Sequence, residues 1–175
     1  KRSLDIENGV AESQRESDDG IIRGSVLAHC RWNNILCRWT DVADAKIFFE
    51  REKDERLLSN TEVLNEQIRY NAEFINGMSY RVTIRVCTDG EMTYTDRFIR
   101  IKNASYLVVV INIGTDMLGI EKELDLYKIP ENIDFKSVDD WNKVCGEHTN
   151  LFSSYMQRVC LKIDADEFVG PTDKR

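Results

Sequence analysis

The segment from Phe74 to Val86 constrains the fold of this chain more than any other part of it. Phe74 is followed by a turn signal at Asn76-Gly77, and apolar and polar residues then alternate from Tyr80 to Val86. Successive side chains of a β-strand point to opposite faces, so this alternation predicts a strand with one buried face. Because Asn and Gly tolerate positive φ, the segment predicts two strands joined by a tight turn.

Similar patterns on both sides of this segment predict a mostly β chain. Thr88-Asp89-Gly90-Glu91 has the composition of a hairpin turn. Seven short strands separated by turn signals are typical of a β-sandwich. The expected strands are residues 24–30, 35–39, 45–51, a short one at 62–64, 68–74, 80–86 and 92–101.

The turn and the alternation after it resemble the E–F corner of a fibronectin type III domain. Asn76 stands where that family usually has Pro, and Met78 where it usually has Thr. The resemblance implies an immunoglobulin-like sandwich with Trp39 in its core. It also implies a structural tyrosine corner, in which the Tyr80 hydroxyl bonds back to the backbone near Phe74.

Composition divides the chain into four parts. Residues 1–20 are polar and rich in acids, which predicts a flexible acidic arm. Residues 21–103 are expected to form the type III-like sandwich, and residues 104–170 an α+β extension or a small second domain. In that extension, 106–113 reads as a buried strand, and Ser137 is a candidate cap for a helix. Residues 171–175 are a tail.

Cys30 and Cys37 are candidates for a disulfide. If Asn33-Asn34 forms a two-residue hairpin turn, the two cysteines lie directly opposite each other, within the Cα separation that a bridge requires. Such a position is a hydrogen-bonded pair, whose geometry suits a bridge less well. Two buried thiols in a β core are the alternative, and five cysteines in all fit either an oxidising or a reducing compartment.

Cys37-Arg38-Trp39 resembles the first module of class I cytokine receptors, where a Cys on one strand bridges a Cys on the next and Trp follows two residues later. The resemblance implies a Cys30–Cys37 bridge and a receptor ectodomain, although no Trp-Ser-x-Trp-Ser motif is present in the chain. Asn103-Ala104-Ser105 is an N-glycosylation sequon. A secreted or cell-surface protein with a glycan on Asn103 is therefore the leading expectation.

The expected function is non-catalytic recognition of a protein partner by a sandwich face or by loops, including the charged connection at residues 52–65. Phe48, Arg81 and Arg85 are the candidate partner-binding residues, because interfaces are enriched in aromatic residues and Arg. The net charge of -7 argues against nucleic acid, and the apolar run at residues 106–113 is too short to span a bilayer.

No catalytic residue, metal site or cofactor is predicted. An intracellular assembly or adaptor subunit with reduced cysteines is the alternative function. A third hypothesis is a small hydrolase or metal protein that uses Cys145 and His148, since these residues are three apart on a predicted helix. The identity of the partner does not follow from the sequence.

Overall fold

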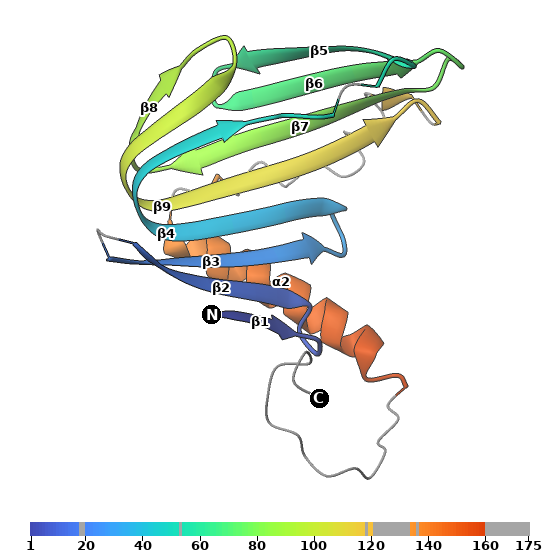
Figure 1. Ribbon diagram of the computed structural model, residues 1–175. Helices are drawn as coiled ribbons and strands as arrows, with labels where there is room; N and C mark the ends of the chain where they lie inside the picture. Colours follow the sequence, from blue (N-terminus) through green and yellow to red (C-terminus); the bar gives the residue numbers. More distant parts are fainter. Residues whose placement is uncertain (18–19, 53, 118, 121–133, 136, 160–175) are drawn as a thin grey trace.

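The computed structural model describes all of residues 1–175 except 18–19, 53, 118, 121–133, 136 and 160–175. Its described part is mostly β, with one long helix (Figure 1). The elements are β1 (Arg2–Asp5), β2 (Val10–Ser17), β3 (Gly20–His29), β4 (Asn34–Phe48), β5 (Leu57–Leu64), β6 (Gln67–Phe74), β7 (Ser79–Thr88), β8 (Glu91–Tyr94), β9 (Phe98–Thr115) and α2 (Val138–Met156).

The nine strands form one antiparallel sheet in the order β1-β2-β3-β4-β9-β7-β6-β5, with β8 paired to β9. A type III sandwich has two separate sheets, so this sheet order does not confirm the predicted sandwich. The prediction of a mostly β fold is confirmed.

Strand β9 lies at the centre of the sheet and is buried on both of its faces. Val108 and Val110 contribute to a cluster under helix α2, whereas Leu107 and Val109 contribute to a second cluster on the opposite face. A strand covered on both faces reads as a continuous apolar run instead of an alternating one. The buried strand expected at residues 106–113 is therefore correct, although it belongs to a longer strand.

Strands β4 and β9 bend together, and the bend lets the sheet curl over its own core (Figure 1). Asp41 and Asn103 both adopt left-handed backbone, with φ of 59° and 53°, and the regular pairing of the two strands is interrupted around them. Asn and Asp tolerate this conformation better than other non-glycine residues. Beyond the bend, Ile99 and Ile101 pack in one cluster with Ile68 and Ile84 of β6 and β7.

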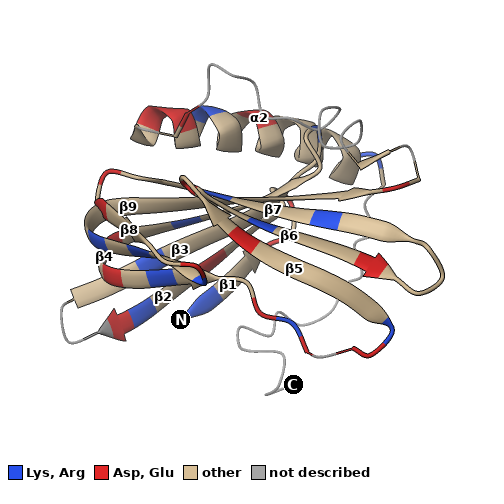
Figure 2. Cartoon of the chain, turned by 90° about the horizontal axis from the view of Figure 1, so that it is seen from above, with Lys and Arg blue, Asp and Glu red and all other residues tan. Residues whose placement is uncertain are grey.

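Helix α2 covers the other face of the sheet (Figures 1 and 2). Ser137 caps its N-terminus by accepting a hydrogen bond from the Asp140 amide at 3.2 Å, as the sequence predicts. Trp141 and Val144 are buried against the sheet. Within the described residues, the structure contains no helix long and apolar enough to cross a membrane.

Two of the expected boundaries differ from the structure. Residues 1–20, predicted to be a flexible arm, contain β1 and β2; β1 pairs with β2, and β2 pairs with β3. Backbone pairing at the sheet edge orders this segment although it has few apolar side chains to bury. The boundary expected between residues 103 and 104 falls inside β9, so the sheet does not end there. The predicted tail at 171–175 lies outside the described residues.

Candidate protein-binding surface

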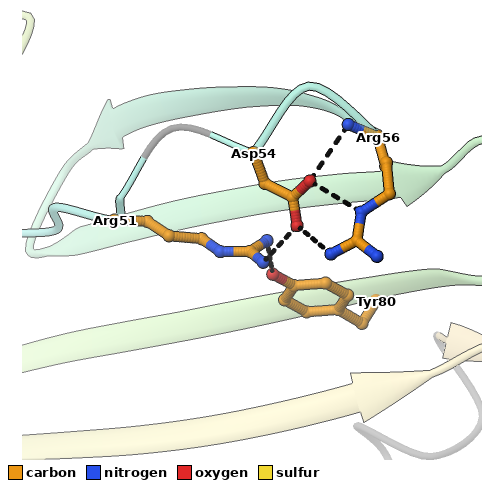
Figure 3. Close-up of polar contacts among 4 residues, drawn as sticks. All are labelled: Arg51, Asp54, Arg56 and Tyr80. Carbon is orange, nitrogen blue, oxygen red and sulfur yellow. Dashed lines mark hydrogen bonds and ion pairs between the residues drawn. The ribbon is translucent and has the colours of Figure 1, made fainter.

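The connection from β4 to β5 is held against strand β7 by a network of charged and polar side chains (Figure 3). Arg51 donates a hydrogen bond from Nη1 to the Tyr80 hydroxyl at 2.7 Å, and its guanidinium carbon lies 5.7 Å from the centre of the Phe74 ring. The Asp54 carboxylate lies 3.6 Å from Arg51 and accepts hydrogen bonds from the backbone and side chain of Arg56. These contacts give the connection a defined conformation.

The surroundings shift the pKa values of Asp54 and Tyr80 in opposite directions. Hydrogen bonding from the Arg56 side chain, followed by that from its backbone, lowers the pKa of Asp54 below the ordinary value of a carboxyl. Burial raises the pKa of Tyr80, and the neighbouring Tyr70 raises it further. The Asp54 carboxylate is therefore charged and the Tyr80 phenol neutral near neutral pH, and both accept hydrogen bonds from arginine side chains in these states (Figure 3).

The turn between β6 and β7 is tied to the same connection. Gly77 has a φ of +90°, which a glycine adopts readily, and its amide donates to the Phe74 carbonyl at 2.8 Å. Phe74 in turn donates its amide to the carbonyl of Met78. The Ile75 amide donates to the Arg56 carbonyl at 2.9 Å, so the turn and the connection form one continuous surface.

We call the surface formed by residues 49–52, 54–57 and 74–78 the connection surface. It contains an apolar hollow of about 480 Å³ and a charged hollow of about 670 Å³. Ile75 is 76% exposed and Met78 46% exposed at the apolar hollow. The apolar hollow is lined by Arg56, Phe74, Ile75, Asn76 and Met78, and the charged one by Phe49, Glu50, Arg51, Glu52, Asp54, Glu55, Leu57, Ser59, Thr61 and Tyr70.

The composition of the connection surface suits contact with a protein. Protein interfaces have an apolar centre and a polar rim, and they are enriched in aromatic residues, Met and Arg. Here the exposed Ile75 and Met78 line the apolar hollow together with Arg56, and Arg51 lines the separate charged hollow together with the acidic residues of the connection.

The three predicted partner-binding residues do not lie on one surface. Phe48 is exposed at the end of β4, on the face opposite to the partly buried Ile47. Arg81 donates to the Asn71 side chain at 2.6 Å, and a guanidinium nitrogen of Arg85 lies 3.5 Å from the Asp134 carbonyl oxygen. Both arginines are on the face of β7 that α2 covers, where their register neighbours on β9 are Gly114 and Val110.

Sequence reasoning pointed to the charged connection but missed Ile75 and Met78. The available signal was the presence of two apolar residues in a turn, where polar residues are usual. Tyr80 was predicted as the residue of a structural tyrosine corner, and its ring lies 6.0 Å from the Phe74 ring. Its hydroxyl contacts Arg51, however, whereas the predicted bond was to the backbone near Phe74.

Cys30 and Cys37 are not opposite each other. The hairpin register pairs His29 with Asn34 and Val26 with Cys37, so residues 30–33 form the turn instead of Asn33-Asn34 alone. Cys30 is exposed in that turn, Cys37 is buried, and both thiols are free. The longer turn shifts the register, and the predicted bridge is not formed in the structure.

Asn103 is exposed at the bend of the sheet, so its side chain is open to solvent. The sequon residue Ser105 is held by Asp89, which accepts hydrogen bonds from both its amide and its hydroxyl. Glycosylation of Asn103 stays a prediction.

The hypothesis of a site built from Cys145 and His148 finds little support in the geometry. Cys145 is half-buried, and burial raises its pKa to about 11. His148 lies instead beside Cys30, with 3.7 Å between Nδ1 and the sulfur. Across the described residues, no group of three or more His, Cys, Asp or Glu side chains is arranged to hold a metal ion.

Comparisons with known proteins bear on the fold alone. No family model matches the sequence, and no curated protein matches it. Among solved structures, a putative kojibiose phosphorylase from the human microbiome is similar over 89% of this chain, with 13% sequence identity and a TM-score of 0.54. The match covers 23% of that chain, so this chain spans about a quarter of the length of the protein that it resembles.

Proposed function

We propose that this chain is a non-catalytic module that binds another protein through the connection surface. The observation that carries the proposal is the pairing of exposed apolar residues, Ile75 and Met78, with a connection already ordered by Arg51 and Asp54. A surface ordered before binding loses less conformational entropy when it binds, so more of its contact energy appears as affinity.

The similarity to part of a longer chain supports a module that works beside another domain. The region matched in the putative kojibiose phosphorylase is 23% of that protein. The proposed partner is a protein domain, either in the same polypeptide or in a separate chain. The activity in the neighbour's name is not part of the proposal, because a likeness at 13% identity concerns the fold.

We place the module in a secreted or cell-surface protein. The resemblance of residues 74–86 to type III modules, which bind proteins, and the exposed sequon at Asn103 support this location. The second candidate is an intracellular assembly or adaptor subunit. It is favoured by one observation, namely that the four described cysteines are free: Cys30, Cys37, Cys87 and Cys145.

Site-specific photo-crosslinking tests the proposed function. A photoreactive amino acid is placed at Ile75, and in a control protein at Val138, which is 50% exposed on the helix. We expect a stoichiometric adduct with one protein from Ile75 and no such adduct from Val138. Equal capture at both positions, or no adduct at Ile75 when the source extract is in excess, would contradict the proposal. Carbamidomethylation of the native protein distinguishes the secreted or cell-surface location from the intracellular one. Free thiols, expected in an intracellular protein, are labelled, whereas cysteines in disulfides are not.

A further inference from the structure

The turn between β3 and β4 reaches helix α2 and brings a thiol next to an imidazole. Cys30 lies in this turn and is exposed, whereas His148 on α2 is 1% exposed. The Cys30 sulfur lies 3.7 Å from Nδ1 of His148 and 3.8 Å from the His148 carbonyl oxygen. A sulfur–nitrogen separation of this size allows an S–H···N hydrogen bond.

The backbone of Gly9 fixes the tautomer of His148. Nε2 of the imidazole lies 3.3 Å from the Gly9 carbonyl oxygen, which can only accept a hydrogen bond. In the neutral ring, Nε2 therefore carries the hydrogen and Nδ1 presents its lone pair to the Cys30 sulfur. Gly9 has a φ of +67°, and a Cβ at this position would come within 3.0 Å of Nε2, so glycine permits this close approach.

Neighbouring rings and an ion pair hold the thiol and the imidazole in place. The His148 ring lies 5.5 Å from the Phe152 ring and 5.6 Å from the ring of His29, which stacks on Trp32 at 3.8 Å. Beside them, Arg31 of the turn and Glu147 of the helix form an ion pair of 2.7 Å. The residues before and after Cys30, His29 and Arg31, thus also contact the helix, at His148 and Glu147.

The surroundings keep the imidazole available as a base. Burial lowers the pKa of His148, although contact with the Gly9 backbone opposes the shift, so the ring is neutral near neutral pH. The other described cysteines are more deeply buried than Cys30, which is exposed. Burial raises the pKa of Cys37, Cys87 and Cys145, which keeps their thiols protonated.

We propose that Cys30 and His148 form a thiol–disulfide exchange site that takes a low-molecular-weight disulfide, with His148 Nδ1 as the proton acceptor. The Cys30 S–H bond gives its proton to Nδ1, and the sulfur attacks one sulfur of the disulfide R–S–S–R. A new S–S bond forms while the original one breaks, and the departing thiolate takes the proton back from the imidazolium. The products are a mixed disulfide on Cys30 and one R–SH, so the disulfide itself is the oxidant.

The first test measures reaction of the native protein with an aromatic disulfide that releases a coloured thiolate. Wild type is compared with Cys30→Ser, His148→Gln and the control Lys143→Gln, an exposed position on the same helix. Near neutral pH we expect one fast-reacting thiol, mapped to Cys30 by mass spectrometry. We expect it to be lost in Cys30→Ser and slowed about 100-fold or more in His148→Gln, which is the usual contribution of a positioned general base.

The pH profile separates proton acceptance from a purely structural role. A thiolate needs no proton acceptor, so the rates of wild type and His148→Gln should converge as the pH is raised. Equal rates for the two proteins at all pH values from about 6 to about 9 would overturn the proposal. A label on Cys37, Cys87 or Cys145 that forms faster than that on Cys30 would overturn it as well.

A second measurement covers the case in which His148→Gln fails to fold. The rate constant for Cys30 in native wild type is compared with that of the same residue in concentrated urea, at the same neutral pH. Because the imidazole is next to the sulfur only in the folded chain, we expect the native rate constant to be larger by about 100-fold. A native rate constant equal to or smaller than that of the unfolded chain would overturn the proposal.

Discussion

Arg51 and Tyr80 lie 2.7 Å apart, from Nη1 to the phenolic oxygen, and this contact joins the connection after β4 to strand β7. The two residues are 29 positions apart in the sequence. The contact orders a stretch of chain that would otherwise carry only solvated charges. It places Arg51 over the Phe74 ring, next to the turn that exposes Ile75.

Tyr80→Phe is expected to loosen the connection without unfolding the protein. The substitution keeps the ring, which packs near Phe74, and removes only the hydroxyl that accepts from Arg51. Hydrogen exchange at the Leu57 amide, which donates to the Asp54 carbonyl, should become faster, while amides of central strand β9 keep their protection. Unchanged exchange at Leu57 would show that the Arg51 contact does not order this segment.

Helix α2 offers a matched pair of valines for testing its attachment to the sheet. Val144 is fully buried under the helix, whereas Val138 is 50% exposed. Val144→Ala removes two buried methyl groups and leaves a cavity, which should lower the free energy of unfolding by about 2 kcal/mol. Val138→Ala should change it by less than about 0.5 kcal/mol. Urea denaturation of both variants checks the difference, and equal losses would contradict the described packing.

Two glycines with positive φ differ in the space around them. A Cβ at Gly9 would lie 3.0 Å from His148 and from the Phe152 ring, whereas a Cβ at Gly77 would meet nothing within 4 Å. Gly77→Ala should therefore carry only the cost of left-handed backbone, about 1–2 kcal/mol. Gly9→Ala should cost more, because it also displaces the helix residues. Thermal unfolding of the two variants tests this order, which would be contradicted if Gly77→Ala were the less stable.

Acid should destabilise the protein through His29, which is 1% exposed. Burial lowers its pKa from 6.5 to about 4, with a further contribution from the adjacent His148; the nearby Glu147 opposes the shift, whereas Arg31 adds to it. The unfolded chain therefore binds a proton near pH 6.5 that the folded chain does not bind until about pH 4. The free energy of unfolding should fall as pH drops through this window, by up to about 3 kcal/mol from this group.

Urea denaturation at several pH values from about 7 to about 5 measures this effect before most carboxylates titrate. His29→Gln, which does not titrate, should show a flatter dependence on pH than wild type. An equally steep dependence in the variant would assign the acid sensitivity to other groups.

The sequence predicted the elements that depend mainly on residues close to them in the chain. Alternation in β7 and the Ser137 cap of α2 were readable because each depends on neighbours within a few residues. The Cys30–Cys37 pairing failed because a turn of residues 30–33 shifts the register of the whole hairpin, and no local pattern specified its length. Strands β1 and β2 were missed because they are held by backbone pairing at the sheet edge, which polar side chains do not reveal.

The candidate surface was only partly predictable for a similar reason. The charges of the connection could be read directly, but their pairing with Tyr80 depends on how β7 approaches residue 51 across the sheet. Phe48, Arg81 and Arg85 were chosen by residue type, which does not show whether three residues share a face. The bend at Asp41 and Asn103 separates the end of β4 from the helix-covered face of β7.

The most direct test of the account is the affinity of the protein that Ile75 captures, measured by calorimetry with purified components. We predict that Ile75→Asp weakens binding by about 30-fold or more, since central apolar residues of interfaces contribute about 2 kcal/mol or more. Val138→Asp, on the helix, should bind as wild type does. Equal affinities for wild type and Ile75→Asp would contradict the claim that the connection surface is the binding site.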